Sequence, residues 1–222
     1  MKRLLLALLA VGSALAAYAA TVTDDFNDGN LTGWTASIGA GLVNTGTSVT
    51  SVNNNSRGSF YTGTVFTNDQ YAQAVINTVV GNRFYSVEVR GNGADSTRDA
   101  YQCTVGATDE YYITEVTNSA GVDLASGTTT LAEGDLLGCE AQGTTITLKI
   151  NTVTIDSVSD GSLTSGAPGL AMFTNDVTGF SFDDFEAGDL GGGGGSAVPV
   201  IMQQIAANDD EHEPRRIAAN AR

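Results

Sequence analysis

Residues 134–186 read GDLLGCEAQGTTITLKINTVTIDSVSDGSLTSGAPGLAMFTNDVTGFSFDDFE, and this stretch decides the fold. Short runs rich in Thr, Val, Ile and Phe alternate there with clusters of Gly, Asn, Asp and Ser. This alternation is typical of antiparallel strands joined by tight turns. The clearest element is a hairpin over residues 144–156, in which Ile146, Leu148 and Ile150 alternate with polar residues and Asn151-Thr152 makes the turn. The stretch therefore predicts an all-β architecture.

The same pattern continues on the N-terminal side of this stretch, so that the globular region is expected to span residues 20–190. No segment has the composition of a convincing helix, and the strand candidates are 21–26, 34–38, 48–52, 70–77, 83–90, 100–105, 111–117, 135–142, 145–150, 153–158, 169–174 and 179–185. Many short strands at regular spacing favour two packed antiparallel sheets. We therefore predict a two-sheet antiparallel β-sandwich.

The N-terminal segment, residues 1–19, has the features of a signal peptide. Lys2 and Arg3 precede an apolar run over residues 4–17, and Ala17-Tyr18-Ala19 matches a small-residue cleavage site, so we expect cleavage after Ala19. The alternative, a membrane anchor, is weaker because the apolar run is shorter than the ~20 residues that a bilayer requires. This pattern predicts a secreted, periplasmic or cell-surface protein without membrane insertion.

The C-terminal segment differs in composition from the rest of the chain. Residues 191–195 are all Gly and predict a flexible linker, and residues 196–222 form a distinct tail. Two interpretations of the tail stay open: a flexible end without structure, or a peptide that docks to a protein partner during assembly.

The chain is strongly acidic, with 25 Asp and Glu against 10 Lys and Arg and a formal net charge of −15. Loss of Lys2 and Arg3 with the leader would bring the mature chain to −17. Such a surface argues against binding to nucleic acid or to anionic membranes. The charge is compatible with simple solubility and also with binding of divalent cations.

The two cysteines are expected to enter an oxidising compartment after export. Cys103 shares the strand phase of Tyr101 and Val105, and Cys139 lies in the phase of its own apolar neighbours, so both side chains are expected to point inward. A disulfide between them would add about 3–4 kcal/mol in the chain-entropy model. Two separate buried thiols are the alternative.

A family resemblance appears at both ends of the globular region. DDFNDG at 24–29 and LTGW at 31–34 resemble the entry strand of concanavalin A-like lectin/glucanase jelly rolls, including laminin-G-like modules. The later part, through residue 186, is similar to that family at GD 134–135, CEA 139–141, Gly143, the strand 146–149, SD 159–160, Gly166, PGL 168–170 and FDDFE 182–186. The resemblance implies that the first and last strands lie near each other in one sheet. Members of the family include glycan-binding modules, glycoside hydrolases and non-catalytic interaction domains.

The carboxylates do not follow the pattern of that family's hydrolases. Those enzymes carry Glu-x-Asp-x-Glu or Glu-x-Asp-x-x-Glu on one strand, and this string is absent here. A retaining glycosidase needs two carboxylates about 5 Å apart, and the nearest arrangements, Asp109-Glu110 with Glu115 and Asp183-Asp184-Glu186, lack the required alternation. The sole histidine, His212, lies in the tail. We therefore predict a protein that is not an enzyme.

Strand phase also suggests a glycan-binding groove on one open sheet face. Its candidate residues are Phe84, Glu88, Arg90, Gln102, and Tyr112 or Glu115, because the phase of residues 110–116 is ambiguous. The alternative is a solvated face with an ordinary Arg–Glu cross-strand pair. Trp34 is expected to be a core plug under the entry loop rather than a sugar platform.

Calcium is a candidate cofactor, since Ca²⁺ prefers six to eight oxygen ligands. Asp24, Asp25 and Asp28 would meet Asp183 and Asp184 if the terminal strands adjoin. The EF-hand spacing is absent, however, and Asp-Gly is also a common turn.

These observations together predict an exported binding module for a glycan or cell-surface polysaccharide. The main alternative is a structural or adhesive surface protein whose tail docks to a partner, and a glycoside hydrolase is the third possibility.

Overall fold

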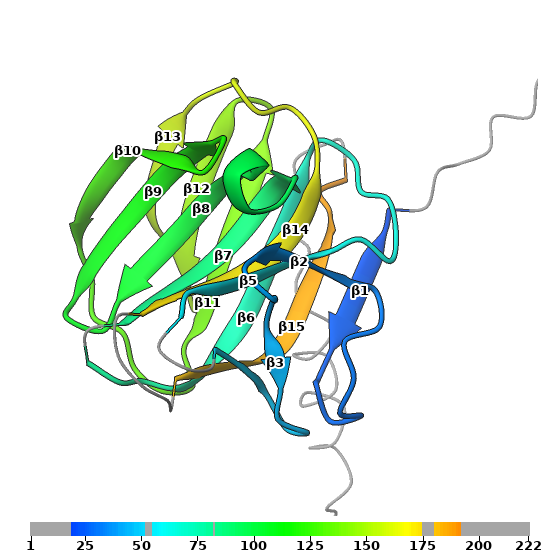
Figure 1. Cartoon of the computed structure of the whole chain (residues 1–222). Helices are drawn as coiled ribbons and strands as arrows, with labels where there is room; N and C mark the ends of the chain where they lie inside the picture. Colours follow the sequence, from blue (N-terminus) through cyan, green and yellow to red (C-terminus); the bar gives the residue numbers. More distant parts are fainter. Residues whose placement is uncertain (1–18, 52–54, 82, 175–179, 192–222) are drawn as a thin grey trace, which may run out of the picture.

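Two antiparallel sheets pack face to face in the computed structural model, which describes residues 19–51, 55–81, 83–174 and 180–191 (Figure 1). This confirms the predicted all-β sandwich. Within the described residues the only helical element is a short 3-10 turn, η1 (Asp95–Thr97).

One sheet has eight strands, all paired antiparallel. In spatial order these are β13 (Val153–Ser159), β12 (Thr145–Ile150), β11 (Leu136–Gln142), β6 (Gln70–Thr78), β15 (Ser181–Asp189), β4 (Val49–Thr50) and β3 (Val43–Asn44), with β1 (Thr21–Asp24) also paired to β15.

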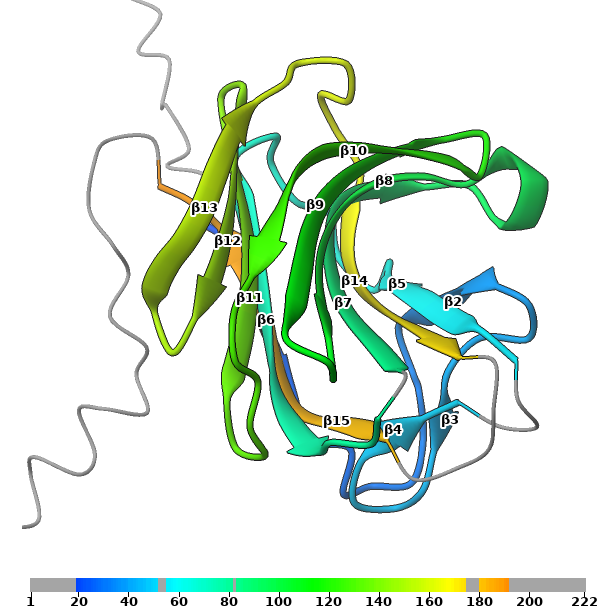
Figure 2. The same ribbon diagram turned by 90° about the vertical axis from the view of Figure 1, so that its left-hand side faces the viewer.

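The other sheet has seven strands. In spatial order these are β10 (Ala120–Thr128), β9 (Glu110–Thr117), β8 (Asp99–Gly106), β7 (Arg83–Asn92), β14 (Ala167–Thr174), β5 (Arg57–Tyr61) and β2 (Trp34–Ile38). Figure 2 shows that the two sheets curve in the same sense and that the seven-stranded sheet lies on the inner side of the curve. Its free face is therefore concave.

The core forms where the alternating apolar residues of both sheets meet. Tyr85, Val87 and Val89 of β7 are fully buried, and so are Ile146 and Leu148 of β12 in the opposite sheet. Burial of such side chains is worth about 1.5–3 kcal/mol each relative to exposure. The period-2 pattern of the sequence thus sets which face of each strand is internal.

A disulfide joins the two sheets inside this core. Cys103 of β8 and Cys139 of β11 are bonded, with their Cα atoms 5.4 Å apart. The predicted bridge is confirmed, and the alternative of two free thiols is wrong.

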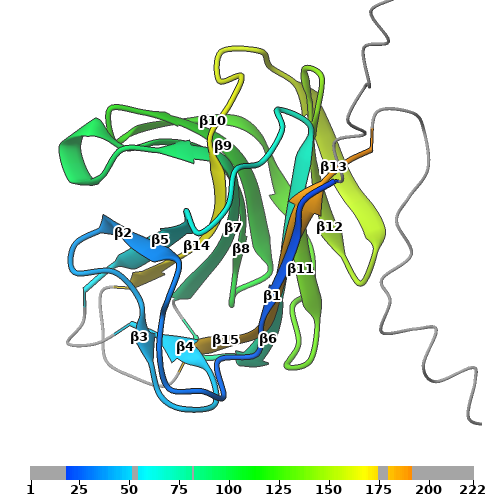
Figure 3. The same cartoon turned by 90° about the vertical axis from the view of Figure 1, so that its right-hand side faces the viewer.

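The first and last strands lie side by side, as the family resemblance implied (Figure 3). β1 pairs antiparallel with β15, and Asp24 lies opposite Phe185. Trp34 packs its ring 4.7 Å from that of Phe185, and its Nε1 donates a 2.8 Å hydrogen bond to Asp24. Because Trp34 contacts the core in this way, the core-plug interpretation is confirmed.

All twelve predicted segments contain a strand, but three strands were missed: β3, β5 and β10. The predicted strand over residues 48–52 is reduced to Val49–Thr50. Residues 1–18 of the predicted leader and residues 192–222, with most of the linker and all of the tail, lie outside the described residues. In the described part of the chain, no helix has the length and hydropathy of a membrane span.

Candidate functional site

Three aromatic side chains gather on the free face of the seven-stranded sheet. Phe84 of β7 and Tyr112 of β9 meet edge to face, with their ring centroids 6.2 Å apart. Phe173 of β14 lies directly opposite Phe84 in the strand register. All three are half-buried rather than internal, because their strand phase directs them away from the core.

Four polar side chains adjoin these rings and complete a shallow hollow of about 270 Å³. Thr114 donates a 2.8 Å hydrogen bond to Asp123 of the edge strand β10, and Thr104 bonds Ser86 at 3.0 Å. In the described part of the chain the Tyr112 hydroxyl has no hydrogen-bond partner. We call this surface the aromatic face, lined by Phe84, Gln102, Thr104, Tyr112, Thr114, Asp123 and Phe173.

The structure brings three of the six predicted ligand-binding residues to this face: Phe84, Gln102 and Tyr112. It also resolves the ambiguous phase of β9. Glu115 lies opposite Tyr101, whose ring is buried in the core, so Glu115 belongs to the internal side of the sheet and not to the groove. Its carboxylate accepts a 3.0 Å hydrogen bond from Thr117.

Glu88 has the predicted strand phase but is fully buried. Arg98, which follows η1, lies over it and forms an ion pair with its carboxylate, and Gln102 donates a 2.5 Å hydrogen bond to the same oxygen. Burial raises the pKa of the Glu88 carboxyl, against the opposing effect of Arg98. Because Arg98 covers Glu88, the prediction that Glu88 is exposed in the groove is wrong.

Arg90 is also displaced from the predicted groove. The β7–β8 register shifts between Val89 and Asn92, and Arg90 has a positive φ of 54°, so the strict alternation of β7 ends before this residue. Its side chain is only 2% exposed. The guanidinium donates hydrogen bonds of 2.8–2.9 Å to the carbonyl oxygens of Asn68, Gly143 and Leu163, so Arg90 joins three loops instead of facing solvent.

Sequence reasoning missed Phe173 and Asp123 as members of the face. Phe173 lies in a predicted strand, but its neighbour in space, Phe84, is far from it in the sequence and only the strand order brings them together. Asp123 lies on β10, a strand that was not predicted. Thr104 and Thr114 also belong to the face. Their strand phase was visible in the sequence and is the signal that locates these two threonines.

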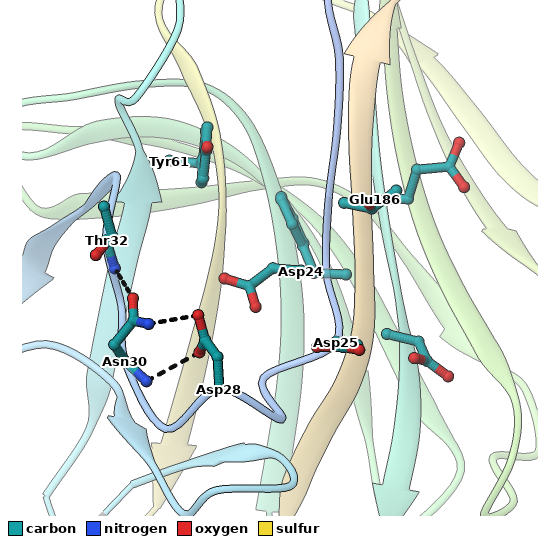
Figure 4. A pocket seen from close by; sticks show the side chains of 10 residues that line it. Asp24, Asp25, Asp28, Asn30, Thr32, Tyr61 and Glu186 are labelled. Atoms are coloured by element: carbon teal, nitrogen blue, oxygen red, sulfur yellow. Dashed lines mark hydrogen bonds between the residues drawn. The ribbon is translucent and has the colours of Figure 1, made fainter.

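A second hollow, of about 420 Å³, lies beside β1 (Figure 4). We call it the acidic pocket; it is lined by Thr23, Asp24, Asp25, Asp28, Asn30, Thr32, Tyr61, Asp184, Phe185 and Glu186. Figure 4 shows Asp24 and Asp28 facing the same space, whereas the Glu186 side chain points away from it. The Glu186 carboxylate instead accepts a 2.5 Å hydrogen bond from Tyr71.

Internal hydrogen bonds occupy most of the carboxylates in the acidic pocket. Asp24 accepts from the backbone N–H of Phe26 and from Trp34 Nε1, and Asp28 accepts from the N–H of Asn30 at 3.0 Å. These are the local turns that Asp and Asn commonly form. These carboxylates therefore stabilise the loop between β1 and β2, which accounts for their presence in the acidic pocket.

Four of the five predicted calcium ligands, Asp24, Asp25, Asp28 and Asp184, line this pocket, and Asp183 does not. Burial, with neighbouring Asp184 and Asp25, raises the pKa of the Asp183 carboxyl. Among the described residues, no group of three or more Asp, Glu, His or Cys side chains is arranged to hold a metal ion. Calcium binding stays a prediction.

No protein-family model matches the sequence. No curated protein matches it either. The structure, in contrast, is similar to several solved structures. It resembles the carbohydrate-binding module CBM66 from Bacillus subtilis with a TM-score of 0.54 at 17% identity, over 72% of this chain and 94% of that one. It also resembles a β-1,3-1,4-glucanase (lichenase) derived from a mouse hindgut metagenome, with a TM-score of 0.54 at 12% identity, over 76% and 98% of the two chains.

A third similar structure is a protein of unknown function with a galectin-like fold from Bacillus subtilis, with a TM-score of 0.57 at 10% identity, covering 75% of this chain and 94% of that one. At these identities the likeness concerns the fold. The chain has the concanavalin A-like jelly-roll fold, as the residues at its two ends suggested. Because this fold hosts both binding modules and glycosidases, it does not choose between them.

Proposed function

We propose that this chain is an exported, non-enzymatic binding module that recognises a neutral glycan through the aromatic face. The main observation behind the proposal is that Phe84, Tyr112 and Phe173 line the same hollow. A pyranose ring has an apolar C–H side that stacks on aromatic rings and a rim of hydroxyls that need hydrogen-bond partners. The aromatic face offers both, since Gln102 and Asp123 lie beside the rings.

The charge of the chain supports a neutral ligand. Its formal net charge of −15 repels anionic polysaccharides, and Asp123 adds a carboxylate to the rim of the hollow. A planar carboxylate accepts hydrogen bonds from two neighbouring hydroxyls, which suits an uncharged sugar.

The carboxylates at the face support a binding role over hydrolysis. Glycoside hydrolysis requires two carboxyl groups on either side of the scissile bond. Of the seven residues that line the hollow, Asp123 alone is acidic, and Glu88 beneath them is paired with Arg98. The face therefore lacks the second accessible group that a glycosidase mechanism uses.

The disulfide is compatible with the exported state that the leader predicts. A partner for the C-terminal tail stays a prediction, because the tail lies outside the described residues.

The test is binding to a broad array of neutral oligosaccharides, followed by titration calorimetry with the best ligand. Tyr112→Ala should weaken binding at least tenfold, a loss of about 1.4 kcal/mol. Asp28→Asn, in the acidic pocket, is the matched control and should bind like the wild type.

Either of two binding results would contradict the proposal: an array on which no neutral glycan binds, or a Tyr112→Ala variant with unchanged affinity. The appearance of shortened oligosaccharides by mass spectrometry after incubation would show hydrolysis and would also contradict it.

A further inference from the structure

The carboxylate of Asp189 joins the beginning of the folded chain to its end. Its Oδ2 accepts a 2.8 Å hydrogen bond from the backbone nitrogen of Ala20, and its Oδ1 accepts a 2.6 Å bond from the nitrogen of Thr67. The backbone N–H of Asp189 in turn donates to the carbonyl of Ala20 at 2.8 Å. One side chain thus holds β1, β15 and the segment before β6 together.

Ala20 is also the residue that follows the predicted cleavage site. Ala19 and Ala20 lie outside any strand, and Ala19 is exposed. The sequence pattern of the leader and the position of Asp189 are independent observations. Both concern the backbone nitrogen of Ala20: the predicted cleavage would free it, and Asp189 accepts a hydrogen bond from it.

We propose that cleavage between Ala19 and Ala20 creates an ion pair between the new α-ammonium of Ala20 and Asp189, and that this pair fastens β1 to β15 in the mature protein. In this step water adds across the Ala19–Ala20 peptide bond. The carbonyl carbon of Ala19 takes the hydroxyl and becomes a carboxylate, and the Ala20 nitrogen leaves as an amine that takes up a proton. An amide donor beside Asp189 is thereby replaced by a cation, and charged hydrogen bonds are stronger than neutral ones.

The surroundings of Ala20 favour a positive charge. Asp69 precedes β6 nearby, and its backbone carbonyl accepts from Leu190. The Arg90 guanidinium forms an ion pair with Asp69, with 3.6 Å between Nη2 and Oδ1. The Tyr71 hydroxyl donates a hydrogen bond to the Glu186 carboxylate. Among the described residues, the ionisable side chains connected to this site by these contacts are Asp69, Tyr71, Arg90, Glu186 and Asp189, of which only Arg90 is a base.

The pH dependence follows from this arrangement. A free α-amine has a pKa of about 7.7–8.0, and a carboxylate partner raises it. The stabilisation is therefore fully present below about pH 7.7 and is lost as the pH rises through the raised value.

The first experiment uses the full precursor, exported through its own leader in a bacterial host. Intact-mass analysis of the exported protein should show Ala20 as the first residue; any other start would overturn the proposal. Lys149 is then the only lysine, because Lys2 is lost with the leader, so amine acylation followed by peptide mapping reports the α-amine separately.

Acylation rates measured against pH give the α-amine pKa. It should lie about half a unit or more above the value for the same protein unfolded in urea. Asp189→Asn should abolish this increase, whereas Asp28→Asn, a remote carboxylate, should keep it. An equal pKa in the wild type and in Asp189→Asn would overturn the proposal.

If Asp189→Asn is not exported, acetylation of the wild-type α-amine provides a second measurement. Acetylation should lower Tm by about 1–3 °C at pH 6, where the amine is charged, and should leave it unchanged at pH 10. The same change at both pH values would contradict the ion pair.

Discussion

Arg90 shows how one buried cation fixes several loops at one end of the sandwich. Its guanidinium donates to three backbone carbonyls, and Gln70 of the opposite sheet accepts from its backbone N–H at 3.0 Å. Arg is suited to this role because its donors are rigidly arranged and its charge is permanent. Without it, three carbonyl groups would lose their partners.

We predict that Arg90→Met lowers the free energy of unfolding by about 3 kcal/mol, because buried polar groups lose their hydrogen bonds. Urea denaturation measures this loss. Lys149→Met, which removes a partly exposed pair with Glu140, is the control and should cost less than about 1 kcal/mol. A loss of similar size in both variants would contradict the assigned role.

At the level of single residues, only part of the candidate site could be predicted from the sequence. Alternation along single strands was enough to place Phe84 and Gln102 on the free face. It failed at Arg90, because a bulge with a positive φ breaks the alternation. It also failed at Glu88, since the covering residue Arg98 reaches it from beyond η1 and strand phase carries no information about coverage.

The β12–β13 hairpin is the element that the sequence predicted best. Asn151 and Thr152 both have a positive φ, 52° and 68°, as a two-residue turn of this type requires. Asn tolerates this conformation, but a β-branched residue such as Thr does not. Thr152 is therefore a strained position in an otherwise regular hairpin.

Thr152→Gly should raise the free energy of unfolding by about 0.5–1 kcal/mol. Glycine removes a left-handed penalty of about 1–2 kcal/mol, and its greater freedom in the unfolded chain offsets part of the gain. Thermal and urea denaturation would measure the change. Thr154→Gly, within β13, should have the opposite sign, and a destabilised Thr152→Gly would contradict the prediction.

Two of the three strands that sequence reasoning missed, β5 and β10, contain glycine near the start of the strand. β5 (RGSFY) begins with Arg and Gly, and β10 (AGVDLASGT) contains two glycines and an aspartate. Glycine and aspartate are depleted in strands, and Val122 and Thr128 are the only β-branched residues of these two strands. Both strands form because paired neighbours supply the hydrogen bonds: β14 and β2 flank β5, and β9 pairs with β10.

The disulfide acts on the whole molecule because it crosses from one sheet to the other. Cys103 and Cys139 are 36 residues apart in the sequence, and their bond closes the loop that contains β9 and β10. A cross-link of this kind restricts the unfolded chain.

The double variant Cys103→Ala and Cys139→Ala should lose about 3–4 kcal/mol of stability in the chain-entropy model. Urea denaturation checks this value, and wild type treated with a reductant should approach the variant. Glycan binding of the folded variant should be unchanged, because neither sulfur reaches the aromatic face. A loss below about 1 kcal/mol would contradict the predicted contribution.

The pairing of β1 with β15 also sets how the domain can be presented. Both strands belong to the eight-stranded sheet, whereas Phe84, Tyr112 and Phe173 lie on the outward side of the other layer. A tether attached at either Ala20 or Gly191 would therefore leave from the rear of the sandwich. If the protein were immobilised through such a tether, the aromatic face would point toward the solvent. It would then be accessible to a large polymer that could not reach the attached side.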